Sequence, residues 1–340
     1  MRNQVARLAG CVVLFAVVSP GPAAEPAAAP IFWRPGDISS RDLFYGSGGK
    51  QLAPGQGPFV FLEEDLGGTK PKIIVRDAGG IKWKVKLGAE ARPETVATRF
   101  LWAVGYTADT TYFVPKMRVR QMPAKLRRGA EFVSSDGFVH DARWERMDAK
   151  NIGQWSWQDD SLESRELNGA RVMMALMNNW DLNKAQNAIQ ERSNGVSYVV
   201  SDLGATFGTT GTRWPGATPR GNVAKFDRSD FIKKVTDEHV DFGSPSWPMM
   251  FGVIPTPPLP YPLITSPLKL LGRNPVPDHT SEWWIGKHVP RSDVRWIAGL
   301  LGQLSPKQIR DAFRAAHYSP DEVEGFSKVM ERRIAELSEI

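Results

Sequence analysis

The chain has almost no cysteine: Cys11 is the only one among 340 residues. Cys11 lies in an N-terminal segment that we expect to be removed, so the mature protein would have no thiol. This excludes disulfide bonds, thiolate metal sites and cysteine nucleophiles. The chain also lacks dense clusters of basic residues. Its formal net charge is only +6, and its densest basic run is Lys125-Leu126-Arg127-Arg128. A nucleic-acid groove needs clustered cations interleaved with aromatics, so no nucleic-acid partner is expected.

Long hydrophobic runs are missing too. Residues 8–18 are apolar, which is too short a run for a permanent transmembrane helix. They follow a short basic segment and precede helix breakers and small residues at positions 19–24, which is the pattern of a secretory signal peptide. We therefore predict a signal peptide at residues 1–24, export to the periplasm or the extracellular space, and no permanent transmembrane anchor.

Two other kinds of site have no signal in the sequence. The histidines lack the i, i+4 pairing and the HExxH spacing of metal sites, so we interpret all of them as structural. They are His140, His239, His279, His288 and His317. A Gly-x-Ser-x-Gly elbow is also missing, so a serine hydrolase has no support.

The distribution of glycine, proline and apolar residues divides the rest of the chain. Residues 25–58 are irregular and form an N-terminal arm, whereas residues 59–122 have the order βββαββ of a small antiparallel unit. Residues 123–160 have few regular signals, residues 243–277 are a Pro-rich insertion that cannot be regular structure, and the last 60 residues look like two or three helices. With 41% hydrophobic and 24% charged residues, the chain can bury a large core in one bilobal unit or two domains.

Local patterns give the individual elements. Strands are expected at 59–64, 72–76, 81–87, 111–114 and 117–119, and a hairpin around residues 135–137. Helices are expected from Pro93 to Gly105, at 164–177, and from the Ser-Pro pairs at 305–306 and 319–320.

The most informative pattern is an acid that follows an apolar strand. Val199 and Val200 lead into Ser201-Asp202, and a glycine-punctuated turn then ends at Phe207-Gly208. Such a turn lets backbone come close to a phosphate while it presents the carboxylate to a metal ion. Upstream, the loop at 177–187 carries Asp181 among several amide side chains, so two polar loops follow one another. This order favours phosphoryl-transfer chemistry.

The motifs resemble those of the protein-kinase-like superfamily, over roughly residues 59–210. Its atypical branches are the most similar: the HipA-type, phosphatidylinositol-kinase-like and CotH-type spore-coat kinases, and the secretory-pathway casein kinases. The resemblance implies an α+β, bilobal protein-kinase-like fold. Residues 59–122 would form its small antiparallel β-rich N-lobe, and residues 123–340 its mostly helical C-lobe.

The resemblance also implies how a nucleotide would be held. Lys86 looks like the strand lysine that contacts nucleotide phosphates, and Glu94 looks like the helix glutamate that pairs with it. The turn at Gly67-Gly68 is the candidate phosphate cover. Three residues remain open as alternatives: Lys82 and Lys84, which alternate with Lys86 on one strand face, and Glu90 in place of Glu94.

The two polar loops take the remaining roles. Asp181 is the candidate base that orients the acceptor hydroxyl, and Asp202 with Asn187 would bind Mg²⁺ or Mn²⁺ through oxygen ligands. Asn187 lies six positions after Asp181, so Asn183 and Gln186 are alternatives to it.

We therefore predict an exported phosphotransferase that uses ATP and Mg²⁺ or Mn²⁺. Its acceptor would be a hydroxyl of a protein, a lipid or a small molecule. Two alternatives stay open. The first is a pseudokinase that acts as a binding module for a protein of the cell envelope, since nucleotide is scarce outside the inner membrane. The second is a structural secreted protein with an accidental motif match.

Overall fold

The structure is a computed structural model that describes residues 31–68, 70–157, 164–182, 187–192, 195–208, 221–243 and 283–340. The expected signal peptide at 1–24 lies outside the described residues, and so does the Pro-rich segment 243–277 apart from Gly243. The described part of the chain is a mixed α+β fold with β-rich sheets and several helices.

A small closed barrel is formed by strands in the order β1-β2-β3-β6-β5. They are β1 Phe59–Asp65, β2 Lys72–Arg76, β3 Lys82–Lys86, β6 Phe138–Arg146 and β5 Thr111–Arg120. The first three are the predicted antiparallel strands, and a short parallel pairing of Phe59 with Val119 closes the barrel. Side chains alternate between the faces of a strand, so Val75 and Val85 point inward and are fully buried. Strand β6 extends the barrel beyond residue 122, the expected end of the small lobe.

Strand β5 is one strand where the sequence predicts two. Pro115, which has no N–H to donate to a ladder, lies within this strand. In the structure β1 pairs with β5 only at Val119 and Arg120. At Pro115, β6 is therefore the one described strand beside β5, and the other side of β5 is an edge. A proline is tolerated at such a position because few ladder bonds depend on it.

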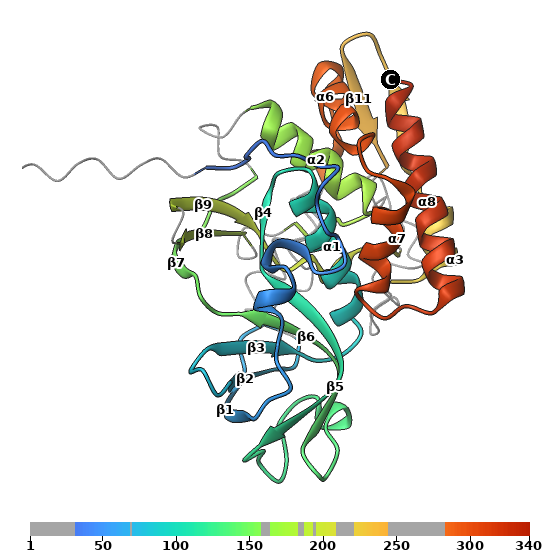
Figure 1. Ribbon diagram of the computed structural model, residues 1–340. Coiled ribbons are helices and arrows are strands. Elements are labelled where there is room, and N and C mark those ends of the chain that lie inside the picture. The colour runs from blue at the N-terminus through green and yellow to red at the C-terminus, as the bar shows by residue number, and fades with distance from the viewer. Residues whose placement is uncertain are drawn as a thin grey trace, which may run out of the picture.

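Helix α1, Ala91–Ala103, follows β3 and begins two residues before the predicted start. Pro93 lies in its first turn, where a missing N–H costs no intrahelical bond. Val96, Phe100 and Leu101 are fully buried. Figure 1 shows α1 in the middle of the molecule, with the barrel strands on one side of it.

A second sheet has the order β4-β9-β8-β7. Its strands are β4 Thr107–Ala108, β7 Lys150–Gly153, β8 Asn187–Arg192 and β9 Gly195–Val200. β8 and β9 form an antiparallel hairpin in which Asn187 pairs with Val200. This register brings the beginning of β8 next to the end of β9, where Asp202 follows.

The remaining elements are mostly helical. They are α2 Arg165–Leu176, α3 Val223–Arg228, α6 Arg291–Leu301, α7 Pro306–Arg314 and α8 Pro320–Ser338, with a sheet of β10 Ile232–Val235, β11 His239–Phe242 and β12 Val289–Pro290. Short 3-10 turns are η1 Gly46–Gly48, η2 Lys50–Leu52, η3 Ala130–Phe132, η6 Leu203–Ala205 and η8 Trp283–Gly286. The predicted starts of α7 and α8 are confirmed, because Ser305 and Ser319 each form a capping box.

The described part of the arm, from residue 31 onward, is irregular and packs on the helical part of the chain. The Trp33 indole donates to the Val104 carbonyl at 2.6 Å. Gln308 Nε2 donates to the carbonyls of Ile38 at 2.8 Å and Arg41 at 2.9 Å. These bonds hold the arm across the C-terminal end of α1 and the beginning of α7.

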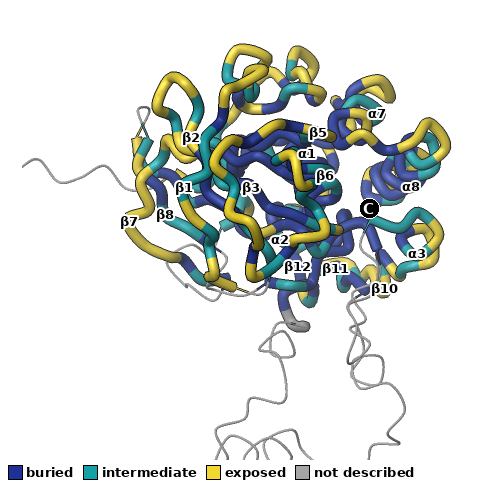
Figure 2. Tube along the Cα trace, turned by 90° about the horizontal axis from the view of Figure 1, so that it is seen from below, coloured by how far each residue is buried: buried dark blue, intermediate teal, exposed yellow. Residues whose placement is uncertain are grey.

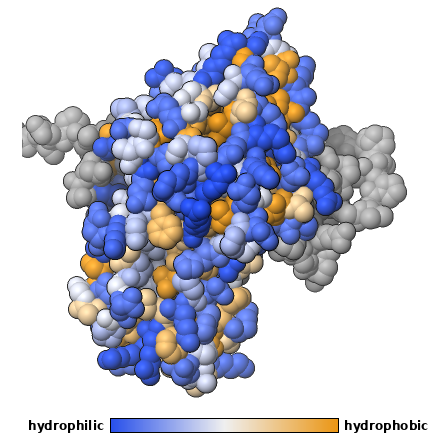
Figure 3. Space-filling view, turned by 45° about the vertical axis from the view of Figure 1, so that its right-hand side comes forward, coloured by the Kyte–Doolittle hydropathy of each residue, from blue (hydrophilic) through white to orange (hydrophobic). Residues whose placement is uncertain are grey.

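Two hydrophobic clusters stabilise the fold. The smaller fills the barrel around Trp83 and Trp144, and the larger joins α1, α2 and the C-terminal helices around Phe100 and Phe313. Figure 2 shows buried segments in the interior and exposed turns around the rim. Hydrophilic side chains cover most of the face in Figure 3. Within the described ranges, no helix combines the length and the apolar character that crossing a membrane requires.

Candidate functional site

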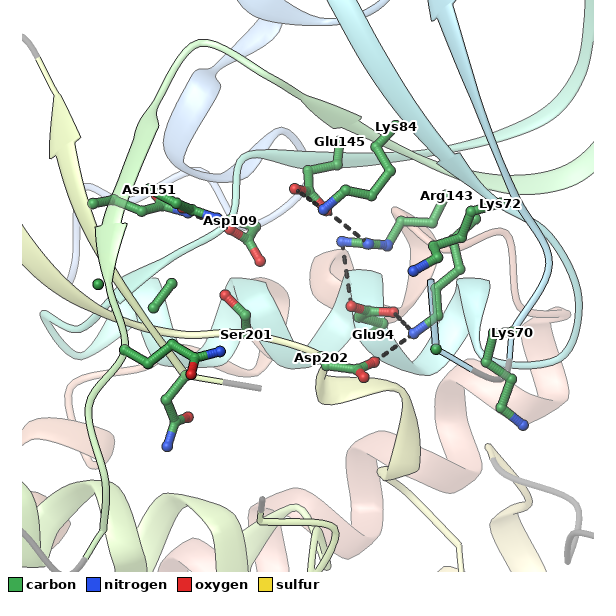
Figure 4. Close-up of a pocket in the computed structure, with 17 residues that line it drawn as sticks. Lys70, Lys72, Lys84, Glu94, Asp109, Arg143, Glu145, Asn151, Ser201 and Asp202 are labelled. Atoms are coloured by element: carbon green, nitrogen blue, oxygen red, sulfur yellow. Dashed lines mark hydrogen bonds and ion pairs between the residues drawn. The ribbon is translucent and has the colours of Figure 1, made fainter. Parts of the chain in front are cut away.

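The last residue of β3, Lys86, is the centre of a buried ion-pair cluster. Its ammonium lies 2.6 Å from Asp202 Oδ1, 2.8 Å from Glu94 Oε2 and 2.9 Å from Glu90 Oε2. Lys86 is 4% exposed. Figure 4 shows the carboxylates of Glu94 and Asp202 lying close together in the cleft. Strand alternation explains the placement, since Val85 enters the barrel core and Lys86 faces the opposite way.

Both candidate glutamates contact the lysine. Glu90 immediately precedes α1 and Glu94 lies one turn later, so their side chains project from the same face of the helix. Carboxylates are also favoured at a helix N-terminus, where the backbone N–H groups carry partial positive charge. The alternatives Glu90 and Glu94 are therefore not exclusive: each pairs with Lys86.

Asp202 is placed by a tight turn after β9. Its backbone has φ +52°, and η6 follows directly. A Cβ added to Gly204 would lie 2.6 Å from the Glu90 Cβ, so only a glycine lets this turn approach α1 so closely. Phe207 anchors the far end of the turn in the larger core, where its ring centroid lies 5.4 Å from that of Phe313.

Strand β6 extends the charge cluster with two residues that the sequence analysis did not select. Arg143 Nη1 lies 3.3 Å from Glu94 Oε1, and Arg143 Nη2 lies 2.8 Å from Glu145 Oε2. Glu145 also accepts from Lys84 Nζ at 2.7 Å. The signal for them is the alternation of Arg143 and Glu145 around Trp144, in a strand that continues the hairpin predicted around residues 135–137.

The cluster fixes the charge state of its members. Burial alone would lower the pKa of Lys86, but Glu94 and Asp202 outweigh it and raise the pKa above its ordinary value. Burial would raise the pKa of Asp202, and the Lys86 ammonium lowers it instead. Both groups are therefore charged over a wide range of pH.

These residues line a cleft of about 490 Å³ between the barrel and the second sheet. Figure 4 shows two ends of it, one with Asp202, Lys70 and Lys72 and the other with Asp109 and Asn151. At the second end the pKa of Asp109 is raised, first by burial and then by the nearby Glu145 carboxylate. We call the end with Lys70, Lys72 and Lys86 the cation-rich end, and the end with Asp109 the acidic end.

The structure brings most of the predicted site residues to this cleft. Lys86, Glu94, Asn187, Asp202 and Gly68 line it. Two do not belong to its lining: Gly67 and Asp181. The backbone N–H of Asp181 is bonded to Asn179 Oδ1 at 3.1 Å, and the alternatives Asn183 and Gln186 lie outside the described residues.

The oxygen donors of the cleft suit a hard divalent cation. The Asp202 side chain is 47% exposed. Asn187 is 3% exposed, and its Nδ2 has no hydrogen-bond partner within the described ranges. Carboxylate oxygens of Glu90, Glu94 and Asp202 also converge within 4.8 Å. Mg²⁺ and Mn²⁺ prefer such carboxylate and amide oxygens. The Asp202 carboxylate and the Asn187 side-chain oxygen therefore fit the predicted metal, whereas the three converging carboxylates surround the Lys86 ammonium.

Comparisons with known proteins add little to this geometry. No protein-family model matches the chain, and no curated protein matches it. Among solved structures, the chain is similar to the Helicobacter pylori proinflammatory kinase CtkA, with 10% sequence identity and a TM-score of 0.35. The alignment covers 79% of this chain and 93% of that one. A likeness this weak does not by itself establish the fold class or the activity of this chain.

Proposed function

We propose that this chain has a bilobal kinase-like fold and transfers the γ-phosphoryl group of ATP to a hydroxyl acceptor. The observation that carries the proposal is the Lys86 ammonium, held in one cleft by Glu94 of α1 and by Asp202 after β9. Phosphoryl transfer needs a fixed cation for the phosphates and an oxygen ligand for the metal within reach of each other. The strand order β1-β2-β3-β6-β5, with α1 following β3, supports the same proposal.

The phosphates would bind at the cation-rich end of the cleft. Lys86 is the main phosphate ligand, and Lys72 and Lys70 line the same end beside the turn at Gly68. Glu94 holds the Lys86 side chain in place, and Arg143 holds Glu94 in turn at 3.3 Å. Glu94 and Arg143 are buried and paired, so they hold Lys86 in a fixed position before nucleotide binds, and its contact with Asp202 must be exchanged for phosphate.

Asp202 and Asn187 are the proposed metal ligands. The β8–β9 register places them at the same end of the hairpin. Bound Mg²⁺ or Mn²⁺ would neutralise phosphate charge and orient the transferred group. For Asp202 to serve as a ligand, it must release the Lys86 ammonium, from which Oδ1 is now 2.6 Å away. Phosphate oxygens that bind Lys86 would favour this exchange.

Asp181 remains the proposed base. It lies between the end of α2 and the beginning of β8, so it would approach the cleft from the helical side and orient the acceptor hydroxyl. Export to the periplasm or extracellular space is part of this proposal, and the acceptor would then be a protein, a lipid or a small molecule found there.

A pseudokinase that binds an envelope protein is the second candidate. Two observations favour it: Asp181 is not among the residues that line the cleft, and Lys86 and Asp202 already neutralise each other. Such a protein would keep the cleft as a rigid scaffold and would transfer no phosphoryl group.

Labelled ATP distinguishes these proposals. The purified protein is incubated with γ-labelled ATP and Mg²⁺ or Mn²⁺, alone and with an envelope extract, and nucleotide binding is measured in parallel. We expect transfer that is lost in Asp202→Asn and Lys86→Ala and kept in Lys82→Ala, which removes an exposed lysine of the same strand. Binding without transfer would favour the pseudokinase. If nucleotide neither bound nor reacted, the phosphotransferase proposal would be wrong, and only a scaffold that needs no nucleotide would remain.

A further inference from the structure

Two histidines and an aspartate meet on the small sheet of β10, β11 and β12. His239 and Asp241 are two positions apart on β11, so their side chains share one face of the strand. The antiparallel register pairs His239 with Pro290 and Val240 with Val289. The same register brings His288, just before β12, opposite Asp241. The histidine spacing in the sequence did not predict this meeting, because it depends on the pairing of distant strands.

The three side chains lie close enough to share one ion. The imidazole rings of His239 and His288 have centroids 4.6 Å apart. His288 Nδ1 lies 3.9 Å from Asp241 Oδ1. One ligand atom from each of the three residues falls within 4.8 Å of the others.

One candidate ligand atom of the group is already desolvated. His239 Nε2 is buried and has no hydrogen-bond partner within the described part of the chain. A buried polar atom without a partner is costly in a folded protein and commonly marks an absent water or ion. Asp241 is fixed in place, since its Oδ1 accepts from the His288 backbone N–H at 2.8 Å. A hydrogen bond of this kind orients a carboxylate ligand.

We propose that His239, Asp241 and His288 bind a divalent transition-metal ion, with Zn²⁺ as the best match. Two imidazole nitrogens and one carboxylate oxygen are a common Zn²⁺ donor set, with a fourth position left for water or another ligand. Zn–N bonds are about 2.0–2.1 Å long, so the rings must move slightly closer together. The His288 side chain is 75% exposed and has room for that movement.

The ion would connect segments that are distant in the sequence. Asp241 and His288 are 47 positions apart. A ligand that closes so long a loop, and binds only the folded chain, stabilises the folded state. Gly286, near the end of this loop, lies against the segment that carries Asp181, because a Cβ added to Gly286 would meet the Trp180 ring at 2.5 Å. The site lies on a different sheet from the cleft, and its existence does not depend on the proposed phosphotransfer.

Metal titration tests the proposal on the whole protein, purified without a histidine tag and stripped with a chelator. Zn²⁺ binding is measured by calorimetry, and Co²⁺ is used as a visible probe of tetrahedral coordination. We expect one tight equivalent and a rise in Tm on adding Zn²⁺. Both should be lost in His288→Ala and in Asp241→Asn, and both should be kept in His140→Gln, which alters a histidine of β6 outside the group.

Two further measurements keep the outcome clear. Asp202→Asn should still bind the tight equivalent, which separates this site from the carboxylates of the cleft. Circular dichroism and the metal-free Tm of His288→Ala should match wild type, because His288 is exposed and its loss leaves no core cavity. Zn²⁺ binding that is absent in wild type, or unchanged in both His288→Ala and Asp241→Asn, would overturn the proposal.

Discussion

The Lys86 ammonium lies 2.6 Å from the Asp202 carboxylate, although 116 positions separate the two residues in the sequence. The same ammonium contacts Glu94, so a single cation joins the barrel, helix α1 and the turn that follows β9. The Lys86–Glu94 pair is buried, whereas the Asp202 side chain is 47% exposed, so a movement of α1 disturbs a more shielded contact than a movement of the Asp202 turn.

Glu94→Gln should destabilise the protein and weaken nucleotide binding. The side chain pairs with both Lys86 and Arg143 and is 1% exposed, so its neutralisation leaves two buried cations short of a partner. Removing one partner of a buried ion pair costs about 3–5 kcal/mol. Urea unfolding measures this loss. Glu63→Gln, which alters an exposed carboxylate of β1, is the control and should leave the urea midpoint unchanged.

Gly204→Ala should disturb the Asp202 turn. The added Cβ would lie 2.6 Å from the Glu90 Cβ, so the turn must move away from α1 and carry Asp202 with it. Forcing extra volume into a packed site costs about 1–3 kcal/mol. Nucleotide affinity should fall together with stability, as measured by calorimetry and urea unfolding.

Gly299→Ala is the matched control for that variant. Gly299 lies in α6, and an added Cβ there meets nothing within 4 Å. Replacing an exposed helical glycine by alanine stabilises a helix by about 0.5–1 kcal/mol. Gly204→Ala should therefore lower the free energy of unfolding, and Gly299→Ala should raise it. Equal changes in the two variants would mean that the close approach of Gly204 to Glu90 has no energetic importance.

Local patterns predicted much of the fold. The alternation in β1, β2 and β3, the turn between β2 and β3, and the Ser-Pro caps of α7 and α8 depend on neighbours in the sequence, and the structure has all of them. The continuous β5 was missed because the tolerance of Pro115 depends on which strands flank it. Sequence alone does not show which strand occupies a barrel edge.

The candidate site, like the fold, was predicted from the sequence only where its residues belong to local motifs. Lys86, Glu94 and Asp202 were selected because each follows a local motif, and the structure brings them together. Arg143 and Glu145 become part of the cleft only through the pairing of β6 with β3, which joins distant segments. The catalytic and metal-binding roles of these residues, and of Asp181 and Asn187, remain predictions until activity is measured.

The stability contributed by Asp202 should depend on pH in a definite direction. Burial would raise the pKa of Asp202, but Lys86 lowers it below the ordinary 3.8. An acid with a lowered pKa in the folded state stabilises that state above its unfolded pKa, and the stabilisation is lost as the pH falls through the folded pKa. The pKa of Lys86 is raised above 10.5, so its contribution is lost only at still higher pH.

Comparison of wild type with Asp202→Asn measures this contribution. The difference in unfolding free energy should be constant between about pH 5 and pH 9 and should shrink below about pH 4. Asp237→Asn, which alters an exposed carboxylate with no ion pair in the described ranges, is the control. A difference that grew on acidification would contradict the pairing of Asp202 with Lys86.

Asn187→Ala should raise the metal requirement of the reaction and leave the fold intact. Its Nδ2 has no hydrogen-bond partner within the described residues, so truncation breaks no bond to that atom, and the cost in stability should stay within about 1 kcal/mol. The Mg²⁺ or Mn²⁺ concentration for half-maximal transfer should increase severalfold. Asn151→Ala, at the other end of the cleft, should leave that concentration unchanged. The reverse pattern would assign the metal to the acidic end.

Asp109 and Glu145, two buried acids that line the cleft, should respond to neutralisation with opposite signs. Burial, and then the Glu145 carboxylate, raise the pKa of Asp109, so ionised Asp109 destabilises the folded state at neutral pH. Burial would raise the pKa of Glu145 too, but Arg143 and Lys84 lower it, so ionised Glu145 stabilises the folded state.

Asp109→Asn should therefore raise the urea midpoint at pH 7 and Glu145→Gln should lower it. The amide introduced by Asp109→Asn keeps an oxygen that can accept from Gln190, whose Nε2 lies 3.4 Å from Asp109 Oδ1. Asp109 also has a side-chain hydrogen bond with Ser201, which the new amide group can keep only if Ser201 becomes the acceptor. The advantage of Asp109→Asn over wild type should disappear as the pH falls below the ordinary carboxyl pKa, because Asp109 is then protonated in both the folded and the unfolded state. Urea unfolding curves at neutral and acidic pH measure both changes in the midpoint. If Asp109→Asn were less stable than wild type at neutral pH, the nearby cations would compensate the buried Asp109 carboxylate in the wild-type protein.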